Sequence, residues 1–140
     1  RLNRMDKAIG EYEKALSHSP RYVEALYNLG NAYTKQGRLD EAIAAYKQAL
    51  ALKPLHAESH TNLGAAYLNN DLVDEAIIQF KKALAIKPGL INARTNLAYA
   101  YYLKGNYRLA LYECDQIKKM GYRIPPELLE LLKPHLSGRT

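Results

Sequence analysis

The sequence predicts an all-α fold, a solenoid of antiparallel helix pairs that ends in a capping helix. Three observations support this prediction: a repeat of 34 residues, apolar residues at helical spacing within each repeat, and prolines and glycines where helices must end. A single helix pair leaves its apolar face uncovered, so neighbouring pairs must stack. The chain is therefore expected to form one continuous solenoid domain.

Residues of the same type recur every 34 positions. The recurring sets are Pro20, Pro54 and Pro88; Ala8, Ala42, Ala76 and Ala110; Leu29, Leu63 and Leu97; Tyr33, Tyr67 and Tyr101; and Ala15, Ala49 and Ala83. This repetition predicts half a repeat over residues 1–22, repeats over 23–56, 57–90 and a degenerate 91–124, a capping helix over 125–136 and a tail over 137–140.

The first full repeat predicts helices over residues 23–36 and 39–52. Apolar or small residues stand at i, i+3, i+4 and i+7, on one face of the first helix: Leu26, Leu29, Gly30 and Tyr33. The second helix has similar spacing. Gly37 can adopt the positive φ that closes the first helix, and Gly105 is expected to do so in the third repeat.

The second helix of each pair has its own start and stop signals. Asp6, Asp40 and Asp74 are expected in its first turn, where a carboxylate favours the positive end of the helix dipole. The repeated prolines end it, because proline cannot donate a backbone hydrogen bond. Residues 1–22 are expected to be the second helix of a repeat whose first helix is missing.

The last segment predicts a cap. Pro125 and Pro126 stand at its start, where a helix tolerates proline. The leucines that follow are expected to cover the end of the stack, with a frayed tail over residues 137–140: Leu128, Leu129, Leu131, Leu132 and Leu136.

The repeat resembles the tetratricopeptide repeat (TPR), whose pattern is Leu-x2-Leu-Gly-x2-Tyr, Ala-x3-aromatic-x2-Ala and Pro. The first full repeat matches it throughout, with Leu26, Leu29, Gly30, Tyr33, Ala42, Tyr46, Ala49 and Pro54. The second has His60 at the first slot, and the third has Cys114 at the aromatic slot and lacks the proline. The resemblance implies a right-handed superhelix whose first helices line the concave side.

Three asparagines occupy one slot of the first helices, and the resemblance places them along the groove: Asn28, Asn62 and Asn96. Such a ladder is similar to the one in the repeat domain of O-GlcNAc transferases. An asparagine amide can donate and accept together, which suits binding of a peptide backbone. The alternative is that these asparagines brace the local helix pair. Asn31 is a further candidate for peptide contact.

Tyrosines complete the candidate peptide-binding surface. Tyr27, Tyr99 and Tyr102 offer apolar area with a hydroxyl group, which suits them to hold a ligand side chain. Alternatively, Tyr99 and Tyr102 pack against a neighbouring repeat or the cap. The family's carboxylate clamp needs cations alongside asparagines. It is disfavoured, because its positions here carry asparagines but no cation: Tyr27, Thr61, Thr95, Asn92 and Asn96.

No pattern in the sequence indicates catalysis, a metal or a cofactor. His56 and His60 have a spacing that can hold a metal, but no further ligand converges on them, and His60 is expected to be a satisfied histidine between helices. Cys114 is expected to be a small buried residue. The protein is therefore predicted not to be an enzyme.

The composition of the chain narrows the kinds of partner that we expect and the cellular compartment in which the protein acts. The net charge is +6, but the charges are interspersed, which argues against nucleic-acid binding. No apolar run suggests membrane insertion, and a single cysteine fits a reducing compartment, so we expect a cytoplasmic location. Because the chain begins with Arg1, it is expected to be a piece of a longer protein that could carry a targeting signal upstream.

Three functional hypotheses follow. The first is a scaffold that binds a peptide or protein segment in the concave groove. The second is a substrate-targeting or assembly module of a larger enzyme such as a glycosyltransferase. The third is self-association through an open apolar end near Ala8, Ile9 and Tyr12.

Replacing Gly30 with leucine tests the predicted close approach of paired helices. The added side chain should overpack the contact and lower the free energy of unfolding by about 1–3 kcal/mol. A thermal melt that is unchanged in Gly30→Leu would contradict the assignment of this glycine to a helix contact.

Overall fold

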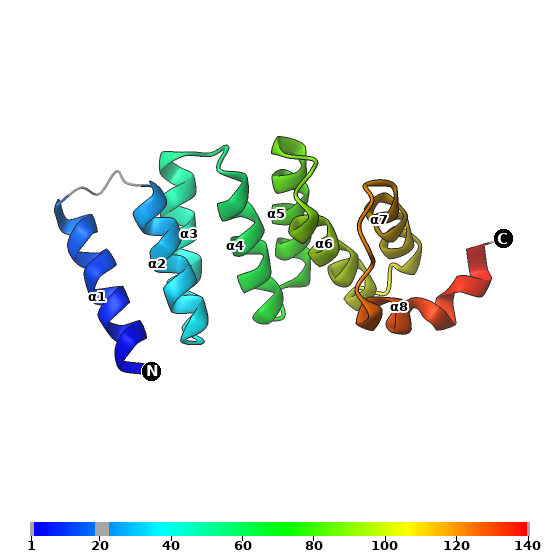
Figure 1. Cartoon of the computed structure of the whole chain (residues 1–140), viewed down its shortest axis with the longest axis horizontal. Coiled ribbons are helices and arrows are strands. Elements are labelled where there is room, and N and C mark those ends of the chain that lie inside the picture. Colours follow the sequence, from blue (N-terminus) through cyan, green and yellow to red (C-terminus); the bar gives the residue numbers. More distant parts are fainter. Residues whose placement is uncertain (1, 19–22, 140) are drawn as a thin grey trace.

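The computed structural model describes residues 2–18 and 23–139, and its helices form a row of stacked pairs (Figure 1). The pairs are α2 with α3, α4 with α5 and α6 with α7, while α1 packs on α2 and α8 on α7. The elements are α1 (Leu2–His18), α2 (Val23–Lys35), α3 (Leu39–Leu52), α4 (Ala57–Asn69), α5 (Val73–Ile86), α6 (Ile91–Leu103), α7 (Tyr107–Lys119), α8 (Pro126–Leu132) and the 3-10 helix η1 (Lys133–Arg139). The all-α fold of antiparallel helix pairs is therefore confirmed.

The turns inside the helix pairs follow the predicted chemistry. Gly37 and Gly105 have φ angles of 74° and 82°, so both close a first helix in the left-handed region, as predicted. Asp71 occupies the equivalent position between α4 and α5 and has a φ of 61°. Aspartate is among the few residues that tolerate this conformation, because its short side chain can bond locally.

The observed ends of the second helices confirm the prediction for the prolines and correct the prediction for one of the aspartates. Helices α3 and α5 end just before Pro54 and Pro88, as predicted, whereas Pro20 lies outside the described residues. Asp40 and Asp74 lie in first turns, but the prediction for Asp6 is wrong. Helix α1 already begins at Leu2, so Asp6 lies one turn further along and instead accepts a hydrogen bond at 2.7 Å from Gln36, in the turn after α2.

In the first two helix pairs, an aromatic ring of the second helix packs against a glycine of the first helix and sets the distance between the two helices. A Cβ atom on Gly30 would lie 2.5 Å from the ring of Tyr46, and one on Gly64 would lie 2.6 Å from the ring of Phe80. Both rings are buried. The sequence predicted that small residues let two backbones approach, but these glycines make room for the ring of the second helix.

The third pair uses a different combination of residues in the same slots. Cys114 replaces the ring, and Ala98 replaces the glycine, and both are buried in one apolar cluster. A thiol needs less room than a ring, which leaves space for the methyl group of Ala98. Cys114 is thus the small buried residue that the sequence predicted.

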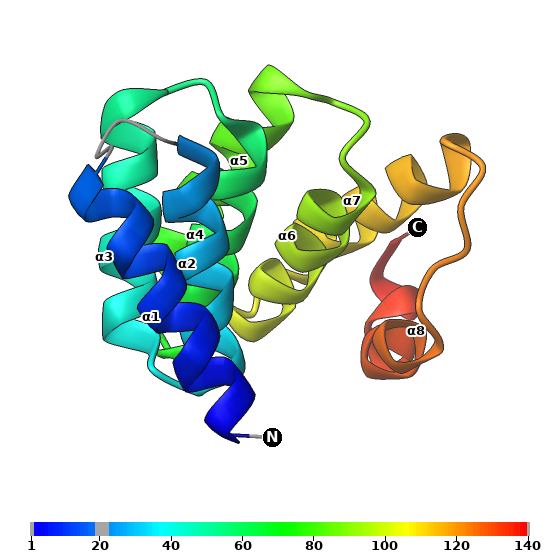
Figure 2. The same cartoon turned by 60° about the vertical axis from the view of Figure 1, so that its left-hand side comes forward.

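The cap differs from its prediction in length and in the residues it buries. Helix α8 ends at Leu132 and the chain continues as η1, so residues 133–136 do not extend the α-helix and residues 137–139 are helical rather than a frayed tail. Leu128 and Leu132 are buried, whereas Leu129, Leu131 and Leu136 are exposed. In Figure 2, α8 is seen nearly end-on while α6 and α7 run across the view, so α8 lies across the direction of these two helices.

The N-terminal end of the stack is less open than the sequence predicted. Ile9 is 4% exposed and packs in a cluster with Leu29 and Tyr33 of α2, while Ala8 and Tyr12 are half-buried. Because α2 covers this apolar stripe, Ile9 is not available for stacking on another molecule.

Two leucines of α8 provide a matched test of the cap. Leu128 is 0% exposed and Leu129 is 45% exposed. Leu128→Ala should lower the free energy of unfolding by about 2–5 kcal/mol, because it leaves a cavity in the core. Leu129→Ala should change it by no more than about 0.5 kcal/mol in the same denaturant titration. Equal effects of the two substitutions would show that α8 does not pack as described.

Candidate functional site

The candidate site lies on the first helices α2, α4 and α6, which contact one another in sequence order. The seven predicted residues all belong to these helices: Tyr27, Asn28 and Asn31 on α2, Asn62 on α4, and Asn96, Tyr99 and Tyr102 on α6. We call this surface the inner face. The structure brings some of these residues into direct contact and leaves others apart.

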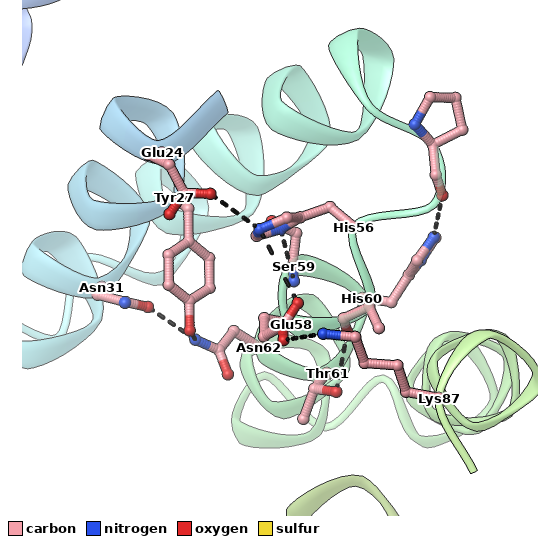
Figure 3. Close-up of polar contacts among 12 residues, drawn as sticks. Glu24, Tyr27, Asn31, His56, Glu58, Ser59, His60, Thr61, Asn62 and Lys87 are labelled. Atoms are coloured by element: carbon pink, nitrogen blue, oxygen red, sulfur yellow. Dashed lines mark hydrogen bonds and ion pairs between the residues drawn. The ribbon is translucent and has the colours of Figure 1, made fainter. Parts of the chain in front are cut away.

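A hydrogen-bonded network joins α2 to α4 on the inner face (Figure 3). The Nδ2 group of Asn62 donates to the hydroxyl of Tyr27 at 3.2 Å and to Oδ1 of Asn31 at 2.8 Å. The same oxygen of Asn31 also accepts the hydroxyl hydrogen of Tyr46 from α3. Tyr27, Asn31 and Asn62 thus form one unit that spans two repeats.

Tyr46 links this network to the core. Its ring packs on Gly30, and its hydroxyl emerges beside Asn31 and lies 3.3 Å from Oγ1 of Thr34. Burial raises the pKa of Tyr46 above its ordinary value, so the hydroxyl stays protonated and acts as a donor to Asn31. The inner-face amides are therefore held in place by a residue of the second helix.

His56 forms a second polar centre at the start of α4. It caps the helix, because its Nδ1 accepts the backbone N–H of Ser59 at 3.3 Å. With Nδ1 as acceptor, Nε2 carries the hydrogen, and it lies 3.2 Å from a carboxylate oxygen of Glu24 on α2. The ring also meets Tyr27 edge-on, with centroids 5.3 Å apart.

Glu58 extends this centre towards α5. Its carboxylate lies 3.9 Å from Nε2 of His56 and 2.8 Å from Nζ of Lys87. The hydrogen bond from Lys87 lowers the pKa of Glu58 below its ordinary value. The pair fixes the exposed edge of α4 beside the network (Figure 3).

His60 is the satisfied histidine between helices that the sequence predicted. Its Nδ1 lies 2.8 Å from Oε1 of Gln79, and its Nε2 lies 2.8 Å from the carbonyl oxygen of Pro54. Both ring nitrogens are therefore used within the protein. Among the described residues, no group of three His, Cys, Asp or Glu is placed to hold a metal ion.

The third repeat contains the same link with different residues, which the sequence analysis missed. Arg94 occupies the slot of His60 and donates to Glu113 at 2.8 Å and to the carbonyl of Pro88 at 3.2 Å. Burial raises the pKa of Glu113, and the bond from Arg94 opposes that rise. The 34-residue register of the three partners was the available signal: 60 with 94, 79 with 113 and 54 with 88.

The three predicted ladder asparagines have different surroundings. Asn28 is exposed, Asn96 is half-buried, and Asn62 is engaged by Tyr27 and Asn31. The structure therefore does not show a uniform ladder like that of O-GlcNAc transferases. Asn62 braces α4 against α2 of the preceding repeat, whereas the alternative drawn from the sequence was bracing within the local helix pair.

The tyrosine pair on α6 lies close to the cap. Tyr102 is near Tyr107 of α7 and His135 of η1, with ring centroids 5.7 Å and 6.4 Å apart. His135 stacks on Tyr107 at 3.5 Å. Tyr99 also packs against the cluster that includes Leu128, and burial raises its pKa. Both tyrosines remain only partly buried, so each can still offer surface to a ligand.

The comparisons with known proteins agree on the fold. A family profile described as TPR repeat matches residues 1–37 and 30–71, and one described as tetratricopeptide repeat matches residues 57–89. No curated protein matches the sequence. No helix within residues 2–18 and 23–139 is both long and apolar enough to cross a membrane.

Solved structures of MamA proteins are similar to this chain. A crystal structure of MamA protein is 27% identical, with a TM-score of 0.75, over 97% of this chain and 68% of that chain. MamA 41-end from Desulfovibrio magneticus RS-1 is 21% identical, with a TM-score of 0.79, over 86% of this chain and 68% of that chain. The second likeness shows the fold alone.

Asn62 and Asn28 provide a matched test of the inner-face network. Asn62→Ala removes two hydrogen bonds of about 0.5–1.5 kcal/mol each, so the free energy of unfolding should fall by about 1–3 kcal/mol. Asn28→Ala, at the exposed equivalent slot, should change it by no more than about 0.5 kcal/mol. Chemical denaturation measures both, and an unchanged midpoint for Asn62→Ala would contradict the network.

Proposed function

Because this chain belongs to the tetratricopeptide repeat family, whose domains generally act as protein-interaction scaffolds, we propose that it binds an extended peptide segment on the inner face. The candidate contact residues are Tyr27, Asn28, Asn31, Asn62, Asn96, Tyr99 and Tyr102. Proteins with such repeats are typically non-catalytic. The proposed activity is therefore recognition of another protein.

The orientation of two amides carries the proposal. Asn31 uses its Oδ1 and Asn62 uses its Nδ2 in the internal network. The groups left out of those bonds are the Nδ2 donor of Asn31 and the Oδ1 acceptor of Asn62. One amide donor on α2 and one amide acceptor on α4 match the C=O and N–H groups of an extended peptide backbone. The network thus supports the proposal by preorganising the two amides, which reduces the entropy lost on binding.

The flanking residues favour a ligand with apolar side chains. Tyr27 lies at one end of the network, and Tyr99 and Tyr102 lie further along on α6. Partly buried tyrosines supply rigid apolar area that costs little conformational entropy when a ligand binds. The proposed ligand therefore has an extended backbone at the amides and an apolar or aromatic residue towards the tyrosine pair.

A selected peptide with modified backbone positions tests the proposal. Peptides that bind this chain would be isolated from a displayed random library, and their Kd measured by calorimetry. Methylating the one backbone nitrogen that faces Asn62 should weaken binding about tenfold, the equivalent of about 1.4 kcal/mol. Methylation at the neighbouring positions should have a smaller effect.

Variants locate the binding surface in the same assay. Tyr99→Ala and Asn96→Ala should weaken binding by threefold or more, whereas Lys82→Ala at an exposed position of the second helix α5 should not. Asn28→Ala tests the exposed slot of the predicted ladder. Equal affinity across all four variants, together with insensitivity to backbone methylation, would place the binding site elsewhere.

A further inference from the structure

A hollow of about 290 Å³ opens between α1 and α3, with α2 behind it. Leu29 and Tyr33 of α2 line it together with Ala44 and Ala45 of α3. Small-molecule pockets usually measure about 300–1,000 Å³, so this space suits one long side chain of a partner. It is distinct from the inner-face network, with which it shares no residue.

The repeats explain why the hollow lies at this junction. The positions of Ala44 and Ala45 carry Ile78 and Gln79 in the second repeat, and Tyr112 and Glu113 in the third. Gln79 is hydrogen-bonded to His60 of α4, and Glu113 is hydrogen-bonded to Arg94 of α6. These bonds direct both side chains towards the first helix of their own repeat. In the first repeat, Leu26 occupies the slot of His60 and Arg94, and Ala45 occupies the slot of Gln79 and Glu113. Neither side chain is polar, so the first repeat has no equivalent hydrogen bond.

The hollow is also the acidic one among the equivalent junctions. Glu13 and Glu41 line it, whereas the same two positions carry Lys47 and Glu75 at the next junction and Lys81 and Leu109 at the third. Each later junction therefore has its own cation at the position of Glu13. The first junction has none at that position.

The two carboxylates differ in how they are neutralised. Oε2 of Glu41 accepts two bonds from Arg38, at 2.8 Å and 3.1 Å. Glu13 accepts the hydroxyl hydrogen of Tyr33 at 2.9 Å, which is a neutral donor. Arg38 also acts on Glu13 through its charge, but its hydrogen bonds go to Glu41. The carboxylate of Glu13 therefore keeps acceptor capacity for a second guanidinium at the rim of the hollow.

We propose that this hollow receives the side chain of an arginine from a partner protein, through a surface separate from the inner face. The apolar stem of the arginine would lie against Leu29, Ala44 and Ala45, and its guanidinium would reach Glu13. A guanidinium beside Tyr33 already occurs in the structure, because Arg38 lies 4.6 Å from the centroid of that ring. Arginine is favoured over lysine because its planar fork binds a carboxylate and an aromatic ring together.

Nuclear magnetic resonance with short peptides tests this proposal. The probes are capped Gly-Gly-Arg-Gly-Gly and the same peptide with citrulline, which keeps the shape of arginine without its charge. The arginine peptide should cause saturable shifts at Leu29, Ala44 and Ala45. The citrulline peptide should bind at least tenfold more weakly, and added salt should weaken the arginine peptide.

Three variants distinguish binding in the hollow from nonspecific attraction of the peptide to acidic residues. Glu13→Gln keeps an acceptor for Tyr33 but removes the charge, and Ala44→Ile fills the hollow with the residue found at position 78. Each should reduce binding of the arginine peptide at least fivefold. Glu75→Gln removes a carboxylate that is also exposed, at the next junction, and should have no effect. Circular dichroism would confirm that all three variants remain folded.

The proposal would be overturned by equal binding of the two peptides, by no saturable shift, or by full binding to Ala44→Ile. Shifts at these residues that grow with protein concentration, in the absence of peptide, would also overturn it. In that case a second copy of the chain fills the hollow.

Discussion

The spacing of the first two helix pairs depends on one kind of contact, in which the second helix packs a ring onto a glycine of the first. At Gly30 and Gly64 any Cβ atom would overlap the facing ring, so the backbone must lie where only glycine fits. The choice of ring then has consequences at the surface. Tyr46 extends a hydroxyl past Gly30 to Asn31, whereas Phe80 has no such group, so the amide network forms at the first pair.

The residues at two facing positions compensate for each other in size across the three repeats. Asn31 with Tyr46, Ala65 with Phe80 and Tyr99 with Cys114 occupy the same two positions 34 residues apart. Where the second helix supplies a small thiol, the first helix supplies a large ring, and Ala98 is tolerated in place of glycine. The degenerate third repeat therefore keeps the same helix arrangement and packs it with different residues.

The sequence predicted the fold well because helix periodicity and turn residues act locally. The bounds of α2 and α3, the positive φ of Gly37 and the stops before Pro54 and Pro88 all depend on nearby residues. Two terminal features were predicted wrongly. How α8 lies relative to α6 and α7 and whether α2 covers Ile9 depend on contacts distant in sequence, which periodicity does not contain.

The candidate site was predictable as a set of positions but not as a set of bonds. The repeat register placed Asn28, Asn62 and Asn96 in one slot, yet their surroundings differ. Asn62 is engaged because Tyr27 and Asn31 stand within reach, a fact set by the relative placement of α2 and α4. The hollow beside Glu13 was missed for a similar reason: it depends on the small side chains of Ala44 and Ala45, where the later repeats carry larger residues, and on how α1, α2 and α3 pack around them.

A crystal structure of the chain with a selected peptide tests the central claim most directly. The account predicts an extended peptide on the inner face, with one backbone N–H donating to Oδ1 of Asn62 and one carbonyl accepting from Nδ2 of Asn31. The internal bonds among Tyr27, Asn31, Asn62 and Tyr46 should be retained in the complex. A peptide bound away from these amides, or one that breaks the network to reach them, would contradict it.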